Sequence, residues 1–232
     1  MINIKFQTSA LQPAPYAYAL QLDLKEDKGK TLAYDLEIEF LDRDSLTEEE
    51  ILEEGFTLSD DLRLKGSLPQ TWLEELKTLI SRTEQTEKDE LEENEDLWLL
   101  DTGKEPFYPK NPRQWADFTE QIRQAILEDS GLEKPLEITL AEVSPAEKKT
   151  TVIRGSFARQ TLIVEKDGTR KSLRWNQLNA LLRDLYSGDL NYDLAATRLK
   201  NAEGIYLNFG DEYWFELGKS YINKPQKVRA WL

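Results

Sequence analysis

The sequence predicts an α+β fold in which antiparallel β-hairpins pack against amphipathic helices. Residues 16–41 alternate between apolar and polar side chains on both sides of a Gly-containing turn, a pattern typical of a hairpin with one buried face. Residues 162–175 and 205–217 show two further hairpin patterns, and the stretches between hairpins carry apolar residues at helical spacing. Strands joined mainly by hairpins, with helices grouped between them, favour this fold over a parallel, doubly wound one.

The first hairpin specifies strongly which of its faces is buried. Its apolar positions, which all point to one side of the predicted strands, are Tyr16, Tyr18, Leu20, Leu22, Leu24, Leu32, Tyr34, Leu36, Ile38 and Phe40. The opposite side carries Ala17, Ala19, Gln21, Asp23, Asp35, Glu37 and Glu39, which we expect to face water. Matching the apolar sides pairs Leu24 with Leu32 and Leu20 with Leu36, and leaves residues 26–30 as the loop.

The elements on either side of this hairpin follow from local signals. Residues 2–8 alternate and predict a first strand. Thr47 is placed to cap a short helix, because Glu50 follows three residues later and completes a capping box, and Gly55 ends that helix. Residues 61–65 predict a short strand.

The next stretch contains the predicted domain boundary. Residues 67–69, Ser-Leu-Pro, predict the start of a second helix, whose apolar stripe consists of Trp72, Leu73, Leu76, Leu79 and Ile80. Residues 81–96 contain a single apolar residue, Leu91, and predict a charged linker or an exposed helix extension. We therefore expect an N-terminal subdomain of hairpin and helices at residues 1–80 and a C-terminal α+β subdomain at residues 97–232.

The C-terminal part begins with a helix over residues 115–129 and strands over residues 136–143 and 151–157. Asp167-Gly168 is a favoured two-residue turn, and it sets Leu162 opposite Leu173 and Glu165 opposite Arg170. Both halves of the chain thus contain a hairpin followed by helical stretches, which predicts two similar ββαα-like halves.

The final elements are a helix, a second helical stretch and a hairpin. Asn176 is placed to cap a helix with apolar residues at core spacing. Residues 191–203 are predicted to be helical. A three-residue loop, residues 210–212, gives the last hairpin a consistent apolar face and sets Leu207 opposite Phe215.

Composition excludes several classes of chemistry. The chain has 232 residues, no cysteine and no histidine, which removes disulfides, thiol nucleophiles, imidazole proton transfer and zinc sites built from those residues. The net charge is −14 and is uneven: residues 1–100 hold 10 Lys+Arg against 25 Asp+Glu, and residues 150–232 hold 13 against 9. No apolar run approaches a membrane span, and the N-terminus lacks the pattern of a signal peptide. We expect a cytoplasmic protein without membrane contact.

One motif suggests an enzyme. Asp42-Arg43-Asp44 follows a predicted strand, and residues 188–193 read Gly-Asp-Leu-Asn-Tyr-Asp. These two segments resemble the first motif and the late metal motif of haloacid dehalogenase-type phosphatases. That resemblance implies a nucleophile at Asp42, a general acid at Asp44, and Mg²⁺ held with the help of Asp189 and Asp193. The alternative interpretation, which we favour, is that Asp42 and Asp44 are solvated acids at the entry to a helix.

Two surfaces and one side chain are candidates for contact with a partner. The acidic outer face of the first hairpin carries Asp35, Glu37 and Glu39. The hairpin around residue 170 carries Arg170, Lys171 and Arg174 near aromatic residues, a combination that can contact nucleic acid. Tyr213, Trp214 and Phe215 cannot all face inward from one strand, so we expect Trp214 at a surface.

These patterns together predict a non-catalytic protein that binds another macromolecule, most simply a protein, and needs no cofactor. Two other functions stay open. One is the Mg²⁺-dependent phosphohydrolase, and the other is a nucleic-acid-associated or DNA-mimicking protein.

Overall fold

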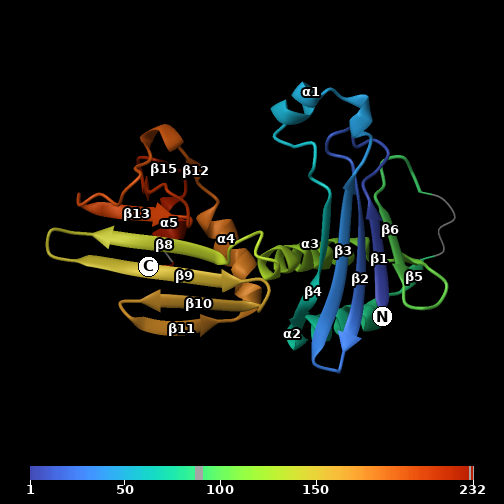
Figure 1. Ribbon diagram of the computed structural model, residues 1–232. Coiled ribbons are helices and arrows are strands. Elements are labelled where there is room, and N and C mark those ends of the chain that lie inside the picture. Colours follow the sequence, from blue (N-terminus) through green and yellow to red (C-terminus); the bar gives the residue numbers. More distant parts are fainter. Residues whose placement is uncertain (87–90, 230, 232) are drawn as a thin grey trace. The chain divides into compact units, whose positions relative to one another are not determined.

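The computed structural model describes residues 1–86, 91–229 and 231. The chain forms two compact units, unit 1 (residues 1–132) and unit 2 (residues 133–232) (Figure 1). This division differs from the boundary expected at residues 81–96, of which residues 87–90 lie outside the described part. The described remainder of that segment belongs to unit 1, because the strand that follows it returns to pair with the first strand of the chain.

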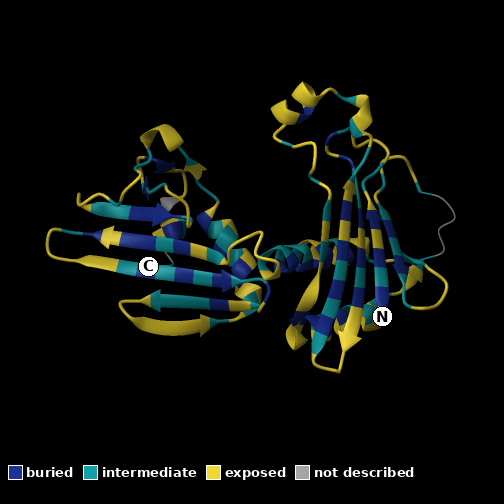
Figure 2. Cartoon of the chain, viewed as in Figure 1, coloured by how far each residue is buried: buried dark blue, intermediate teal, exposed yellow. Residues whose placement is uncertain are grey.

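Unit 1 is built on a five-stranded antiparallel sheet with the order β4-β3-β2-β1-β6. Its strands are β1 (Ile2–Gln7), β2 (Tyr18–Asp27), β3 (Thr31–Phe40), β4 (Leu62–Pro69) and β6 (Leu97–Asp101). Two short strands, β5 (Gln85–Thr86) and β7 (Tyr108–Pro109), pair with each other beside it. The buried and exposed positions alternate along β2 and β3 (Figure 2), which confirms the predicted apolar face along these strands. Tyr16, predicted on that face, precedes β2 and is exposed instead.

The pairing within the first hairpin differs from the prediction by two residues. Leu24 lies opposite Tyr34 and Leu20 opposite Ile38, so the predicted pairs with Leu32 and Leu36 are wrong. A shift by two keeps every side chain on its face, so the hydrophobic pattern cannot distinguish the two registers. Ala17, expected to face water, is buried. It precedes β2, and its carbonyl accepts a hydrogen bond from the Leu41 amide.

Two helices cover one face of this sheet: α2 (Gln70–Arg82) and α3 (Pro112–Asp129) (Figure 1). A third, α1 (Glu48–Glu53), lies in the connection between β3 and β4, and the predicted capping box of Thr47 and Glu50 is present. The start predicted for α2 is wrong, because Ser67 and Leu68 belong to β4 and the helix begins at Gln70. Leu68 is fully buried in the sheet, and tertiary pairing with β3 extends the strand as far as the proline.

Unit 2 contains a six-stranded antiparallel sheet with the order β11-β10-β9-β8-β13-β14. Its strands are β8 (Leu136–Val143), β9 (Lys148–Ser156), β10 (Thr161–Lys166), β11 (Thr169–Leu173), β13 (Gly204–Asn208) and β14 (Phe215–Glu216). The predicted pairs Leu162–Leu173, Glu165–Arg170 and Leu207–Phe215 are confirmed. The remaining elements are α4 (Leu178–Leu185), α5 (Pro225–Arg229), the strand pair β12 (Asp189–Leu190) and β15 (Tyr221–Ile222), and short 3₁₀ turns.

Two predictions in unit 2 are wrong. Asn176 does not cap a helix; it lies inside a 3₁₀ turn, Trp175–Gln177, that leads directly into α4. Residues 191–203 contain one 3₁₀ turn, Tyr192–Leu194, instead of a helix. The Ala196 backbone there forms two hydrogen bonds with Trp214, and this pairing with a distant segment overrides the local helical tendency.

The two units share one order of elements. In each, four consecutive strands form a meander, a helix follows, and a later strand pairs antiparallel with the first strand of the meander. That strand is β6 in unit 1 and β13 in unit 2. The similar halves therefore exist, but each is larger than the ββαα unit predicted.

Candidate functional site

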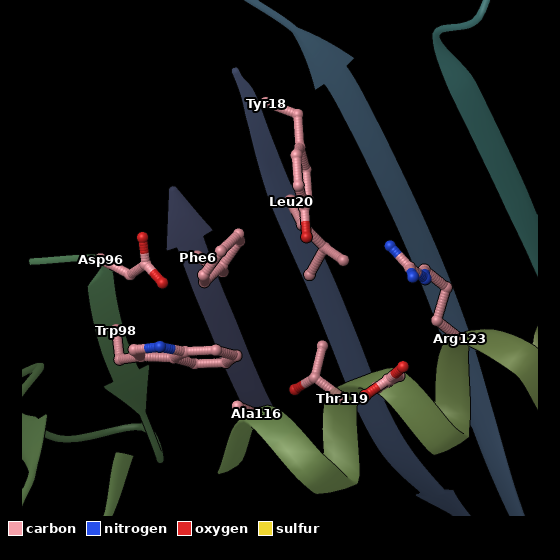
Figure 3. A pocket seen from close by; sticks show the side chains of 9 residues that line it. Phe6, Tyr18, Leu20, Asp96, Trp98, Ala116, Thr119 and Arg123 are labelled. Carbon is pink, nitrogen blue, oxygen red and sulfur yellow. The ribbon is translucent and has the colours of Figure 1, made fainter. Parts of the chain in front are cut away.

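Unit 1 contains a pocket of about 280 Å³ between α3 and the strands β1, β2 and β6 (Figure 3). Side chains from both the sheet and the helix line it: Phe6, Tyr18, Leu20, Asp96, Trp98, Ala116, Thr119, Glu120 and Arg123. Because the sheet supplies one wall and α3 the other, the pocket lies where the helix crosses the end of the sheet.

The sheet side of the pocket is aromatic. Phe6 on β1 lies opposite Leu20 of β2 and Trp98 of β6, so the three side chains share the inner face. The Phe6 ring centroid lies 4.7 Å from that of Trp98 and 5.2 Å from that of Tyr18. Phe6 and Trp98 are each 8% exposed, so this wall is packed in place before any ligand binds.

The helix side supplies polar groups. Thr119 is 5% exposed, and its hydroxyl oxygen has no hydrogen-bond partner in the described part of the chain. Most buried hydroxyls are paired, and an unpaired one costs about 1–3 kcal/mol. Arg123 lies one helical turn further along the same face of α3, and Figure 3 shows both side chains on the pocket side of the helix. The pocket thus offers hydrogen-bond donors beside an apolar wall.

Two exposed carboxylates, Asp96 and Glu120, stand at the edge of the pocket. Asp96 accepts a hydrogen bond of 2.9 Å from the Ser9 amide, which fixes its position. The arrangement suits binding of an apolar group that carries a hydrogen-bond acceptor.

The structure does not bring the phosphatase-like residues together within one unit. Asp42 and Asp44 lie in unit 1, on a 3₁₀ turn after β3, whereas Asp189 and Asp193 lie in unit 2. The strand that precedes Asp42 is antiparallel to both of its neighbours, unlike the parallel strand of that family. Among the described residues, no group of three or more Asp or Glu side chains could hold a metal ion.

The acidic face of the first hairpin is partly neutralised by the neighbouring strand β4. The Lys65 ammonium lies 2.5 Å from the Asp35 carboxylate, and Arg63 lies 3.7 Å from Glu37. Glu39 is exposed. The three residues therefore share one face as predicted, but two of them lie beside cations.

The basic hairpin of unit 2 carries a ladder of charges across four strands. Arg154 on β9 pairs with Glu137 on β8 at 2.8 Å and with Glu165 on β10 at 3.3 Å. Glu165 also pairs with Arg170 on β11 at 3.0 Å. All three cations of the expected surface, Arg170, Lys171 and Arg174, are exposed, and Arg170 is held beside Glu165.

Trp214 is half-buried instead of exposed. It packs against the buried cluster of Ala141, Val143 and Tyr206. The segment around Ala196 pairs with its backbone, a contact that local sequence patterns do not predict. Trp214 therefore contributes to packing as well as to the surface.

The unit 1 pocket was not found from the sequence. A detectable signal was Thr119, a polar residue that lies among the apolar positions Trp115, Phe118 and Ile122 of the predicted helix. The aromatic wall depends on β6 pairing with β1 across about ninety intervening residues, and local patterns cannot specify that pairing.

Comparison with models of protein families, with curated proteins and with solved structures finds no match to this chain. In the described part, no helix has the length and apolar character needed to cross a membrane.

Proposed function

We propose that the protein is a non-catalytic, cytoplasmic protein that binds another protein and holds an apolar or aromatic side chain of that partner in the unit 1 pocket. The observation that carries this proposal is the buried, unpaired hydroxyl of Thr119 beside the rings of Phe6 and Trp98. A bound group with a carbonyl or carboxylate next to its apolar body would pair with this hydroxyl.

The size of the pocket is compatible with a single large side chain. Pockets for drug-sized ligands span about 300–1,000 Å³, and this one, at about 280 Å³, lies at the lower end of that range. Burying one Leu or Phe side chain contributes about 1.5–3 kcal/mol. A few such anchors, surrounded by contacts of little energy, dominate the affinity of typical protein–protein interfaces.

A pocket-filling variant tests the proposal. Ala116→Leu places a larger side chain into the pocket from α3, and we expect it to abolish capture of the partner that the unaltered chain retains from an extract of its own cells. Ala10→Leu, at an exposed loop position of the same unit, is the matched control and should retain that partner. The proposal would be contradicted if the unaltered chain, Ala116→Leu and Ala10→Leu all captured the same partner in equal amounts per molecule of bait protein.

Removing the unpaired hydroxyl gives a second readout. Thr119→Val keeps the shape of the side chain and removes the unsatisfied group, so the free energy of unfolding should rise by about 1 kcal/mol while capture of the partner weakens. Thr78→Val is the control, because the exposed Thr78 hydroxyl donates to the Glu74 carbonyl. A Thr119→Val protein that is destabilised and still captures the partner would show that the hydroxyl has a structural role instead.

A further inference from the structure

Unit 2 carries a second aromatic surface that is distinct from the unit 1 pocket. Five rings form a continuous chain of contacts: Tyr186, Phe209, Phe215, Tyr192 and Tyr213. The centroids of Tyr186 and Phe209 lie 4.4 Å apart, and those of Phe209 and Phe215 lie 6.2 Å apart. Tyr192 packs edge-on against Phe215 at 5.2 Å and Tyr213 at 5.4 Å. We call these five residues the aromatic cluster.

The cluster has a buried centre and two exposed rings. Phe215 is fully buried, whereas Tyr186 is 52% exposed and Tyr192 is 55% exposed. The neighbouring Leu194 is 58% exposed. Large apolar side chains that gather on a surface, as opposed to occurring singly, mark sites of interaction.

The turn that carries part of the cluster is held rigidly. Asn208 is 8% exposed, and its side-chain amide donates to the carbonyl oxygens of Asp211 and Tyr213 at 2.9 and 2.8 Å. Its own oxygen accepts from the Gly210 amide at 3.0 Å. The Asp211 carboxylate accepts from the Tyr213 amide at 2.9 Å. These bonds fix the turn and the Asp211 carboxylate in position without a ligand.

The charges that act on the cluster are acidic. Burial and then the negative charge of Asp211 raise the pKa of Tyr186 above its ordinary value. A hydrogen bond with Glu212 and the charge of that carboxylate raise the pKa of Tyr213, and Asp211 adds to this. Unit 2 as a whole is basic, with 16 Lys+Arg against 13 Asp+Glu in residues 133–232. The two carboxylates beside the aromatic cluster, Asp211 and Glu212, therefore have the opposite sign to the net charge of the unit.

We propose that the aromatic cluster, with Asp211 and Glu212, binds a basic peptide segment of a partner protein and places an arginine or lysine side chain over the exposed rings of Tyr186 and Tyr192. A ring face attracts a cation, and adjacent carboxylates add charge complementarity. This inference does not rest on the proposed function of unit 1, because it concerns different residues and a different chemistry.

Titration of the full chain with a fluorescent, arginine-rich decapeptide tests the proposal, with glutamine-rich and glutamate-rich peptides for comparison. We expect binding of the arginine peptide at physiological salt, and about tenfold weaker binding for Tyr186→Ala and for Tyr192→Ala. Tyr192→Phe keeps the ring and should bind within about twofold of the unaltered chain. Glu212→Gln, at an exposed position, keeps the rings and should weaken both the binding and its dependence on salt.

A matched control tests whether the arginine-rich peptide binds to the acidic unit 1 instead. Tyr16 is 41% exposed, packs edge-on against Phe56 at 5.3 Å and donates a hydrogen bond to Glu54, so it combines a ring and a carboxylate in that unit. Tyr16→Ala should leave the affinity unchanged. The proposal fails if Tyr186→Ala and Tyr192→Ala bind the peptide as tightly as the unaltered chain. It also fails if Tyr16→Ala weakens binding equally, or if a neutral oligosaccharide binds the rings and the arginine peptide does not.

Discussion

Units 1 and 2 share a strand order but place their aromatic side chains differently. In unit 1, helices of 13 and 18 residues cover the sheet, and Phe6 and Trp98 are enclosed beneath the longer one. In unit 2, the helices have 8 and 5 residues, and partly buried residues from loops, such as Phe209 and Tyr213, complete the core. Rings at the edge of that core reach solvent.

The difference shows that the strand order alone does not determine the binding surface. Residues 1–132 hold 14 Lys+Arg against 31 Asp+Glu, a net charge of −17, whereas residues 133–232 have a net charge of +3. In unit 1 the aromatic side chains line a pocket under the longer helix, whereas in unit 2, with its shorter helices, Tyr186 and Tyr192 are exposed. If the two proposed sites bind partners, we expect the charge of the surrounding residues to select between those partners.

In both units, nevertheless, a tyrosine hydroxyl attaches the end of a helix to a strand or turn. Disrupting this contact should have the largest effect on the free energy of unfolding. In unit 1, the Tyr34 hydroxyl donates to Asp129 at the end of α3 at 2.7 Å, and a Cβ atom on Gly66 would overlap that hydroxyl. In unit 2, the Tyr221 hydroxyl donates to the Leu185 carbonyl at 3.0 Å, and a Cβ atom on Gly188 would overlap its ring. Gly66→Ala and Gly188→Ala should each lower the free energy of unfolding by about 3 kcal/mol.

Urea denaturation followed by circular dichroism measures this loss. Gly55→Ala is the control, because no atom lies within 4 Å of the added Cβ and only its φ of +81° disfavours alanine; we expect a loss of about 1 kcal/mol. If Gly188→Ala leaves the free energy of unfolding unchanged and Gly66→Ala lowers it, the tyrosine contact stabilises unit 1 alone. The two units would then differ in this respect.

A pH titration sharpens the same comparison with a smaller effect. Burial, and then the hydrogen bond to Asp129, raise the pKa of Tyr34 above its ordinary value of 10.0. A raised pKa in the folded state means that the contribution of Tyr34 is fully present below about pH 10 and is lost as the pH rises further. Tyr34→Phe should cost about 1 kcal/mol at neutral pH and should reduce the decline of unfolding free energy above pH 10. An unchanged alkaline decline would show that other groups cause it.

Local patterns predicted most of the elements, and the errors have physical causes. The capping box at Thr47 and the turn at Asp167-Gly168 depend on neighbours in sequence, and both are confirmed. The hairpin register failed by two residues because hydrophobic alternation has a period of two. The helix predicted over residues 191–203 is wrong because the backbone of Ala196 pairs with that of Trp214, in a later segment of the chain.

Surface chemistry was harder to predict than the fold. Asp35 and Arg170 were identified by charge alone, but cross-strand neighbours pair with both of them. The pocket wall of Phe6 and Trp98 requires long-range pairing of β1 with β6. The aromatic cluster of unit 2 likewise joins residues from the end of α4, the 3₁₀ turn Tyr192–Leu194 and the hairpin of β13 and β14. Such groupings arise from tertiary structure, and a single sequence carries only weak signs of them.

The smallest expected change in the free energy of unfolding comes from removing one carboxylate from each charged sheet face. Glu165 lies between Arg154 and Arg170 in the ladder of unit 2, so Glu165→Gln leaves two cations next to each other without their shared carboxylate. Exposed ion pairs contribute about 0.2–1 kcal/mol each, and we expect a loss of less than about 1 kcal/mol that shrinks in 1 M salt. In unit 1, the Glu37 carboxylate lies 3.7 Å from the Arg63 guanidinium. The unit as a whole has a net charge of −17, so the average surroundings of Glu37 are negative. Glu37→Gln should therefore leave the free energy of unfolding unchanged or raise it slightly, and a loss equal to that of Glu165→Gln in denaturant titrations would contradict the electrostatic contrast between the units.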